Sequence, residues 1–304
     1  MKKFLSLILA ALLLSVCALA GAEEVVMKVS SPNGAPALAL ATLAVKAPEN
    51  YTLVAAETIS AEFANQNSDF IIAPVNAGAK LYKAGKSTYK LAGIVSWGNL
   101  FFASQKENFT LADLNGAAVT LFGENTINAA VVRYAMEANS IAPASIEYLG
   151  SAANTQALLL SDAEAIVLTA EPALTAAKIK NEKITAYSVN QLYKAATGYD
   201  GYTQAALFVK AETAEKYPEA VAEFIKAVAE SCAMCTTDVA AVAEAAVTLK
   251  ILPNQKVAMN AIPNCAVRFM SALDAKAQLE QTASVDLTQF GGALPADDFY
   301  YGAE

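Results

Sequence analysis

The sequence contains no histidine in its 304 residues. This absence excludes Ser–His and Cys–His nucleophile pairs, general acid–base catalysis by histidine, and metal sites with histidine ligands. Carboxylate or lysine chemistry remains available, so the absence disfavours an enzyme without excluding one. We therefore predict a protein with no catalytic residues, no metal site and no cofactor.

Positive charge is also scarce. Lysine and arginine together number 21 against 29 acidic residues, which gives a formal net charge of −8. The only arginines are Arg133 and Arg268, and no basic stripe runs along any segment. A nucleic-acid partner needs such a positive surface, so the composition argues against nucleic-acid binding.

Cysteine occurs four times, and Cys232 and Cys235 form a CAMC motif within an alanine-rich helical pattern. At that spacing the Cβ atoms of a helix lie about 5–6 Å apart, beyond the ~3.5–4.5 Å of a disulfide. Neither a second pair nor a histidine accompanies the motif, which argues against zinc. Two alternatives remain: a disulfide from one of these cysteines to Cys265, as an oxidising compartment permits, or three buried free thiols. We favour the free thiols.

The chain begins with MKKFLSLILAALLLSVCALAGAEE, which combines two lysines, an apolar run and small residues. This pattern is typical of a secretory signal peptide, which we assign to residues 1–22 with cleavage near Ala22. The alternatives are a lipid attached to Cys17 and a retained membrane anchor. In each case the working domain lies outside the cytoplasm, in the periplasm or at the cell surface. Cleavage removes Lys2 and Lys3 and leaves 19 basic against 29 acidic residues, a net charge of −10.

Short apolar runs typical of strands alternate with helical runs, which indicates an α/β fold with parallel sheets. The predicted strands are 25–30, 52–56, 69–74, 90–104, 117–122, 145–149, 164–169, 184–189 and 204–209. The predicted helices between them are 36–46, 59–66, 76–84, 126–139, 153–161 and 171–180. Beyond about Thr213 we predict only helices, over 213–233, 237–248, 253–260 and 264–283.

Two long strand-like stretches divide this series. The first is 90–104, and the second runs from the glycine-rich ATGYDGYTQ into ALFV. A complete β-α-β-α-β-α-β set, residues 117–189, lies between them. We therefore predict two lobes joined by two crossovers, with a hinge near 97–102 and 199–204. The predicted boundaries are 23–98 plus 204–304 for lobe 1 and 99–203 for lobe 2.

Parallel α/β sheets bind ligands outside the carboxyl ends of their strands. The stretches that follow the predicted strands are SPNGAP (31–36), PVNAG (74–78), GENT (123–126) and TAEP (169–172). Each opens a helix and offers a capping side chain or a glycine. Each is therefore either a simple corner or a source of free N–H groups for a ligand. Four such stretches from two lobes favour the second interpretation.

Two side chains near these stretches have two interpretations each. Trp97, the only tryptophan, packs in the core or stacks on a flat ligand at the hinge. Glu171 is an exposed first-turn carboxylate favoured by the helix dipole, or it accepts a hydrogen bond from a ligand amine, which we favour. If the protein is an enzyme, Glu171 or Glu124 serves as the base.

Six motifs occur in order over nearly the whole mature chain: SPNGAPALALA, DFIIAPVNAGAKLY, LAGIVSWGNLFFAS, LADLNGAAVTLFGENTINAAVVRYAMEAN, LLLSDAEAIVLTAEPALTAA and YTQAALFVKAETAEKYPEAVAEFIKAV. In this order they resemble the solute-binding subunits of ABC importers, in the branch grouped with nitrate, sulfonate and thiamine-precursor binders. The resemblance implies a two-lobed periplasmic-binding-protein type II fold with C-terminal helices. It also implies a small-molecule ligand gripped between the lobes and delivered to an ABC permease in the membrane. We expect a monomer.

The resemblance places ligand-binding residues at Ser31, Asn33, Gly34, Ala35, Asn76, Trp97, Asn99, Gly123, Asn125, Thr126, Glu171, Tyr202 and Gln204. Binders of sulfonate and nitrate often bring a positive or histidine side chain to the anion. This sequence has neither arginine nor histidine at these positions, so the charge of the ligand stays open. A related branch of enzymes makes the thiamine pyrimidine from an active-site histidine, and the lack of histidine excludes that chemistry here.

Overall fold

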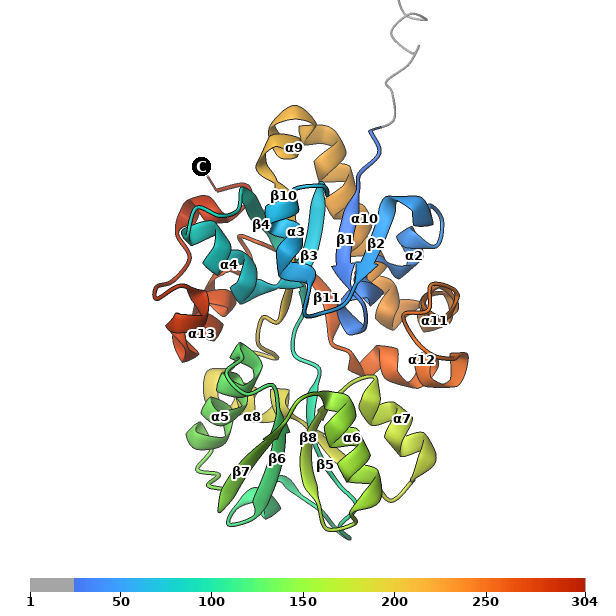
Figure 1. Ribbon diagram of the computed structural model, residues 1–304, viewed down its shortest axis with the longest axis vertical. Coiled ribbons are helices and arrows are strands. Elements are labelled where there is room, and N and C mark those ends of the chain that lie inside the picture. The colour runs from blue at the N-terminus through green and yellow to red at the C-terminus, as the bar shows by residue number, and fades with distance from the viewer. Residues whose placement is uncertain (1–24, 304) are drawn as a thin grey trace, which may run out of the picture.

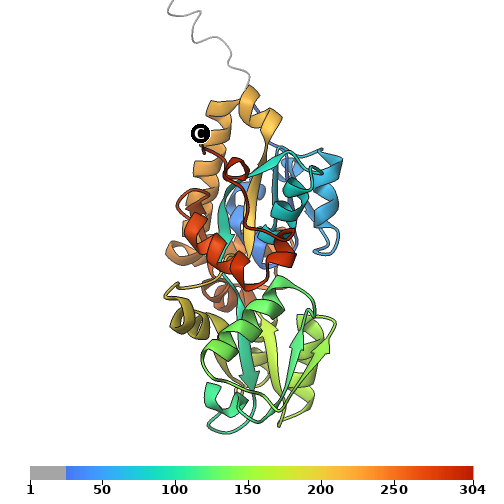
Figure 2. The same cartoon turned by 90° about the vertical axis from the view of Figure 1, so that its left-hand side faces the viewer.

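The computed structural model describes residues 25–303, which form two β-sheets flanked by helices (Figures 1 and 2). The predicted signal peptide and Cys17 lie outside the described residues. Within 25–303, no helix is both long enough and apolar enough to span a bilayer. The mixed α/β fold predicted from the sequence is confirmed.

The first sheet has six strands in the order β11-β4-β10-β3-β1-β2. Their bounds are β1 Val29–Pro32, β2 Tyr51–Val54, β3 Phe70–Pro74, β4 Tyr89–Ser96, β10 Ala205–Lys210 and β11 Val267–Ser271. Strands β2, β1 and β3 are parallel. Strand β10 is antiparallel to both β3 and β4, and β11 is antiparallel to β4.

The second sheet has five strands in the order β7-β6-β8-β5-β9. Their bounds are β5 Leu100–Ser104, β6 Ala118–Phe122, β7 Ser145–Leu149, β8 Ile166–Ala170 and β9 Thr185–Ser188. Strands β7, β6 and β8 are parallel, whereas β5 is antiparallel to β8 and β9. The sequence predicted parallel sheets, whereas each sheet combines three parallel strands with antiparallel ones. The chain leaves the first sheet along β4 and returns along β10, so the two crossover strands run in opposite directions.

Within residues 25–303, twelve α-helices cover the sheets. They are α2 Ala41–Ala44, α3 Glu62–Asn65, α4 Val75–Lys83, α5 Ile127–Ala138, α6 Ala152–Ser161, α7 Ala173–Lys180, α8 Val189–Thr197, α9 Ala211–Lys216, α10 Pro218–Thr237, α11 Val239–Thr248, α12 Gln255–Ala261 and α13 Lys276–Val285. In Figure 1, α5 to α8 surround the lower sheet and the remaining helices surround the upper one.

The secondary structure predicted from the sequence needs correction at five places. The predicted helices 36–46 and 59–66 begin as 3₁₀ turns, Ala35–Leu40 and Ile59–Ala61, and only α2 and α3 within them are α-helical. Helix α8 was not predicted. Strand β11 lies where only helices were expected, because VRFMS pairs with the free edge of β4. The long stretch 90–104 is two strands, β4 and β5, interrupted at 97–99.

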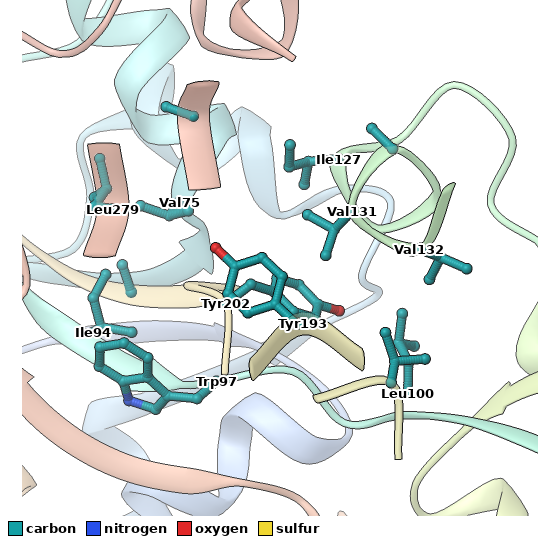
Figure 3. Packing of buried hydrophobic residues seen from close by; sticks show 14 of the residues in the cluster. Val75, Ile94, Trp97, Leu100, Ile127, Val131, Val132, Tyr193, Tyr202 and Leu279 are labelled. Atoms are coloured by element: carbon teal, nitrogen blue, oxygen red, sulfur yellow. The ribbon is translucent and has the colours of Figure 1, made fainter. Parts of the chain in front are cut away.

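The two crossovers pack directly against each other (Figure 3). Trp97 and Tyr202, one from each crossover, are buried in the same apolar cluster as Val131 and Tyr193. The side-chain amide of Asn190 donates hydrogen bonds of 2.9 Å to the carbonyl oxygens of both Trp97 and Gly98. This apolar cluster therefore draws residues from both sheets rather than from one.

Glycines at both crossovers permit this close approach. Gly98 has a φ of +84°, and a Cβ on it would overlap the Tyr202 ring. A Cβ on Gly201 would overlap the carbonyl oxygen of Trp97. At Gly98 glycine provides both the positive φ and the space, and at Gly201 it provides the space. We propose that the chain divides here into lobe 1, residues 25–98 plus 204–303, and lobe 2, residues 99–203.

All three described cysteines are free and buried: Cys232, Cys235 and Cys265. The favoured alternative of three buried thiols is therefore the one that the structure shows, and the disulfide to Cys265 is absent. Burial raises the pKa of the Cys235 thiol to about 12. The cysteines pack with residues of α10 and of the first sheet, so they serve as small apolar core residues.

Gly201→Ala tests the contact between the crossovers. We expect overpacking to cost about 2 kcal/mol, which corresponds to a melting temperature lower by about 4–8 °C. Gly150→Ala is the matched control, because its Cβ would meet only Asn154 Oδ1 at 3.6 Å. Thermal unfolding followed by circular dichroism measures both. Equal melting temperatures for the two variants would show that the crossovers do not depend on this contact.

Candidate functional site

A cavity of about 330 Å³ lies where the two crossovers meet the ends of the sheets. Its lining residues are Pro32, Asn33, Pro36, Ala56, Pro74, Asn76, Ala77, Asn99, Asn125, Thr126, Ile127, Asn128, Gln204, Ala205 and Gln289. Pro32 ends β1 and Pro74 ends β3, so the cavity opens at the carboxyl edge of the first sheet. The start of α5 contributes the facing wall from the second lobe.

The cavity lining is polar but uncharged. Its polar side chains are five asparagines, two glutamines and one threonine, and its other residues are prolines, alanines and one isoleucine. None of the lining residues is charged or aromatic. Amide side chains both donate and accept hydrogen bonds. The lining can therefore recognise a polar ligand, but none of its residues titrates near neutral pH.

Two helices begin at the cavity. Asn76 and Ala77 belong to the first turn of α4. The backbone N–H groups of a first turn have no acceptor within the helix. Thr126 caps α5 by accepting from the Ala129 N–H at 3.3 Å, and it donates to the Gly123 carbonyl oxygen at 2.6 Å. The positive ends of both helix dipoles therefore favour hydrogen-bond acceptors in the cavity.

Gln204 and Asn99 form the part of the lining that comes from the crossovers. The Gln204 amide donates to Asn99 Oδ1 at 3.1 Å and accepts from the Ser96 hydroxyl at 3.3 Å. Asn99 Nδ2 donates to the Glu171 carbonyl oxygen at 2.9 Å. Its backbone carbonyl accepts from the Glu171 N–H at 3.0 Å. Both amides are thus oriented by bonds that join the two crossovers to β8.

Two further hydrogen bonds connect separate segments of the chain around the cavity. The Tyr202 hydroxyl donates to Asn128 Oδ1 at 3.1 Å, which ties the second crossover to α5. The Gln289 amide donates to the Asn125 carbonyl oxygen at 3.0 Å, which joins the C-terminal segment of lobe 1 to lobe 2. Asn125, Asn128 and Gln289 all line the cavity.

The cavity brings together six of the predicted site residues: Asn33, Asn76, Asn99, Asn125, Thr126 and Gln204. The other seven do not line it: Ser31, Gly34, Ala35, Trp97, Gly123, Glu171 and Tyr202. Ser31 and Ala35 are buried, with 1% and 5% of their surface exposed. Gly123 provides the positive φ of +73° that the turn before Thr126 requires. Tyr202 is fully buried and acts on the cavity through Asn128.

Trp97 packs in the core, which is the first of its two interpretations. Only 1% of its surface is exposed, and its indole N–H donates to the Arg268 carbonyl oxygen at 3.0 Å. The Arg268 guanidinium lies 3.9 Å from the indole ring centroid, a distance typical of a cation–π contact. Both the polar atom and the face of the indole are therefore occupied within lobe 1.

Gly34 turns the chain and is not among the residues that line the cavity. Its φ is +104°, and a Cβ there would meet nothing within 4 Å. Its neighbour Asn33 does line the cavity, and Asn33 Oδ1 accepts from the Gly34 N–H at 2.9 Å.

Glu171 faces a different hollow. It is 4% exposed, and its carboxylate accepts from the Thr175 N–H at 3.1 Å and from the Thr175 hydroxyl at 2.9 Å. These bonds stabilise the first turn of α7, as the helix-terminus interpretation predicted, although the carboxylate is buried instead of exposed. With Thr175 and Lys178 it lines a hollow of about 450 Å³ between α7 and α12. Burial raises the pKa of this carboxyl.

Sequence reasoning missed three residues of the lining that have clear structural origins. Ala56 follows β2, whose end was not considered among the strand-end loops. Asn128 lies two residues beyond Thr126, in the first turn of α5, and its proximity to GENT was a usable signal. Gln289 comes from the C-terminal segment, where no pattern in the sequence points to the cavity.

Residues 96–239 match the model of the family described as NMT1/THI5 like. The search of curated proteins finds no match. The resemblance stated from the sequence motifs is therefore confirmed over this segment.

Solved structures match over most of the chain. An ABC transporter protein from Parabacteroides distasonis is 23% identical, with a TM-score of 0.79 over 92% of this chain and 99% of that one. The periplasmic aliphatic sulphonate binding protein SsuA from Escherichia coli is 14% identical, with a TM-score of 0.69 over 91% and 92%. A DszB mutant in complex with biphenyl-2-sulfinic acid is 13% identical, with a TM-score of 0.59 over 90% and 96%. These likenesses establish the fold.

Glu171→Gln tests the role assigned to this carboxylate. Because the folded pKa lies above the ordinary value of 4.5, the folded state binds the proton more tightly than the unfolded state. Wild-type stability should therefore fall as pH rises from about 4.5 through the raised folded pKa. The glutamine keeps an acceptor for Thr175 but does not titrate, so its stability should lack this decline. Urea unfolding at a series of pH values measures both proteins. Parallel pH profiles would contradict the assignment.

Proposed function

We propose that the protein is an extracytoplasmic solute-binding protein that captures a small molecule between its two lobes and delivers it to an ABC permease. The observation that carries this proposal is the cavity itself. Its wall comes from strand ends and helix starts of both lobes and from both crossovers. Its volume lies at the small end of the range typical of ligand sites, so a compound of low molecular weight fits it.

The comparisons support this proposal. The matched family and the structural neighbours are mostly transport solute-binding proteins, and the ABC transporter protein from Parabacteroides distasonis covers nearly the whole described chain. We further propose that the six cavity residues predicted from the sequence bind the ligand together with Asn128 and Gln289. A monomer, either free in the periplasm or attached to the membrane through Cys17, suits this role.

An enzyme on the same fold is the alternative, and DszB is an enzyme among the neighbours. The chemistry of the cavity favours binding instead. General acid–base catalysis requires a titratable group within hydrogen-bond reach of the substrate, and the lining residues contain none. The two carboxylates considered as bases, Glu124 and Glu171, both lie outside the lining, and Glu171 is bonded to Thr175.

We propose that the crossovers act as a hinge. Between the lobes, Gln289 of the C-terminal segment bonds Asn125 of lobe 2. Opening the cavity requires this bond to break, whereas Trp97 and Tyr202 stay packed in the core between the crossovers. A ligand that contacts both walls would favour the closed arrangement, because it binds that state more tightly.

Release of a bound compound tests the transport role. Protein purified without denaturation should release one small compound when denatured, and mass spectrometry should identify it unchanged after prolonged incubation with the protein. At ~100 times its dissociation constant, this compound should stabilise the protein by ~2.7 kcal/mol, a melting shift of about 5–11 °C. Asn33→Ala should reduce that shift. Asn260→Ala, an exposed amide on α12 outside the lining, should not. Conversion of the compound would favour the enzyme alternative, and the absence of any bound compound would contradict both.

Small-angle scattering tests the hinge. The radius of gyration should fall when the released compound is added back to the empty protein. Gln289→Ala removes the bond to Asn125 and should raise the radius of gyration of the empty protein, while the liganded value stays close to that of the wild type. An identical radius with and without the compound would contradict a hinge at the crossovers.

A further inference from the structure

Asn76 has the one lining amide whose oxygen is buried without a hydrogen-bond partner among residues 25–303. It lies in the first turn of α4, beside the carboxyl end of β3. A buried polar atom left unpaired costs about 1–3 kcal/mol. Native proteins pair nearly all such atoms, so each exception calls for an explanation.

The neighbouring amides are already committed to the protein. Gln204 uses its oxygen for Ser96 and its nitrogen for Asn99. Asn99 uses its nitrogen for the Glu171 carbonyl. Asn128 accepts from Tyr202 through its oxygen, which leaves its nitrogen to donate. Asn33 and Asn125 also line the cavity, but both are exposed. Asn76 is therefore the lining amide away from the surface that can offer both a donor and an acceptor to a bound solute.

The lining favours an uncharged solute. An ionised group taken out of water without a partner of opposite charge carries a large desolvation penalty, and none of the lining residues carries a charge. The N-terminal ends of α4 and α5 attract hydrogen-bond acceptors, and a neutral carbonyl oxygen can serve as that acceptor as well as an anion can. An ionised carboxylate or sulfonate group, however, has no hydrogen to donate to Asn76 Oδ1, and its negative charge repels that oxygen.

Resting on the proposed transport role, we propose that the solute is uncharged and carries an N–H beside a carbonyl, as in a carboxamide, a lactam or a ureide. Its N–H donates to Asn76 Oδ1, and its carbonyl accepts from Asn76 Nδ2. The Asn128 nitrogen and the first-turn N–H groups of α4 bind its remaining acceptors. The lack of aromatic residues in the lining means that recognition depends on these hydrogen bonds and on shape.

Matched probes test this inference. The panel pairs nicotinamide with nicotinate, propionamide with propionate, and propane-1-sulfonamide with propane-1-sulfonate, and adds 2-pyrrolidone and hydantoin as neutral members. Calorimetry and melting-temperature measurements should show that each neutral member binds at least about tenfold more tightly than its anionic partner. Their affinity should not change between low and high salt, because no charge is paired in the cavity.

Three variants, measured with the tightest probe, locate the recognition at Asn76. Asn76→Leu removes both donor and acceptor and should weaken binding by about tenfold or more. Asn76→Asp keeps an acceptor at a helix start that favours carboxylates, so the variant should fold. Its affinity for a neutral probe should be only about tenfold lower. For an anionic probe, the new carboxylate and the probe would be two negative charges at about the separation of a hydrogen-bonded pair. Their repulsion should weaken the binding of that probe by several hundred-fold or more. Asn260→Asp makes the same chemical change on α12, outside the lining, and should change neither affinity.

The outcomes separate this inference from the transport role. Tighter binding of the anions, or a panel in which nothing binds although denaturation releases a compound, would overturn the inference and leave the transport role standing. An Asn76→Leu variant that is folded by circular dichroism and binds as tightly as the wild type would also overturn it. If nothing in the panel binds and no compound is released, both the inference and the proposed function fail.

Discussion

The close contact between the two crossovers is the constraint on which the rest of the structure depends. Gly98 and Gly201 let the two segments come so close that a side chain at either position would overlap the other segment. The Asn190 amide donates to the carbonyl oxygens of Trp97 and Gly98 in the first segment. This contact holds the exit of the chain from the first sheet beside its return. The direction of β10 and β5 in their sheets follows from it.

The same contact places the cavity. Asn99 lies just before β5 and Gln204 lies just before β10. The hydrogen bond between their side chains therefore joins the two crossovers at the cavity wall. Val75, at the start of α4, donates to the Gln204 carbonyl at 3.0 Å. The helix that carries Asn76 is therefore positioned by the crossover itself. Any movement of one lobe relative to the other acts directly on the lining.

The electrostatic character of the cavity separates recognition from stability. Two charged side chains near the crossovers lie outside this cavity. The buried Glu171 is bonded to Thr175 at the start of α7, and the half-buried Arg268 covers the indole of Trp97. The cavity is left with amides and helix starts, which discriminate by hydrogen-bond direction. Amide groups recognise a pattern of donors and acceptors without the desolvation penalty that a buried ion pair carries, which suits the proposed capture and release of a solute.

The amino-acid sequence by itself determined the alternation of strands and helices, the inserted β-α-β-α-β-α-β set and the positions of both crossovers, because hydrophobic periodicity and glycine turns are local signals. Strand-end asparagines such as Asn33 and Asn76 were predictable for the same reason. Tertiary structure alone decided which way each side chain faces. Trp97 and Glu171 stand beside the right loops, yet packing turns one into the core and the other toward α12. Strand β11 and Gln289 depend on contacts between segments more than 150 residues apart in the chain, which no local pattern records.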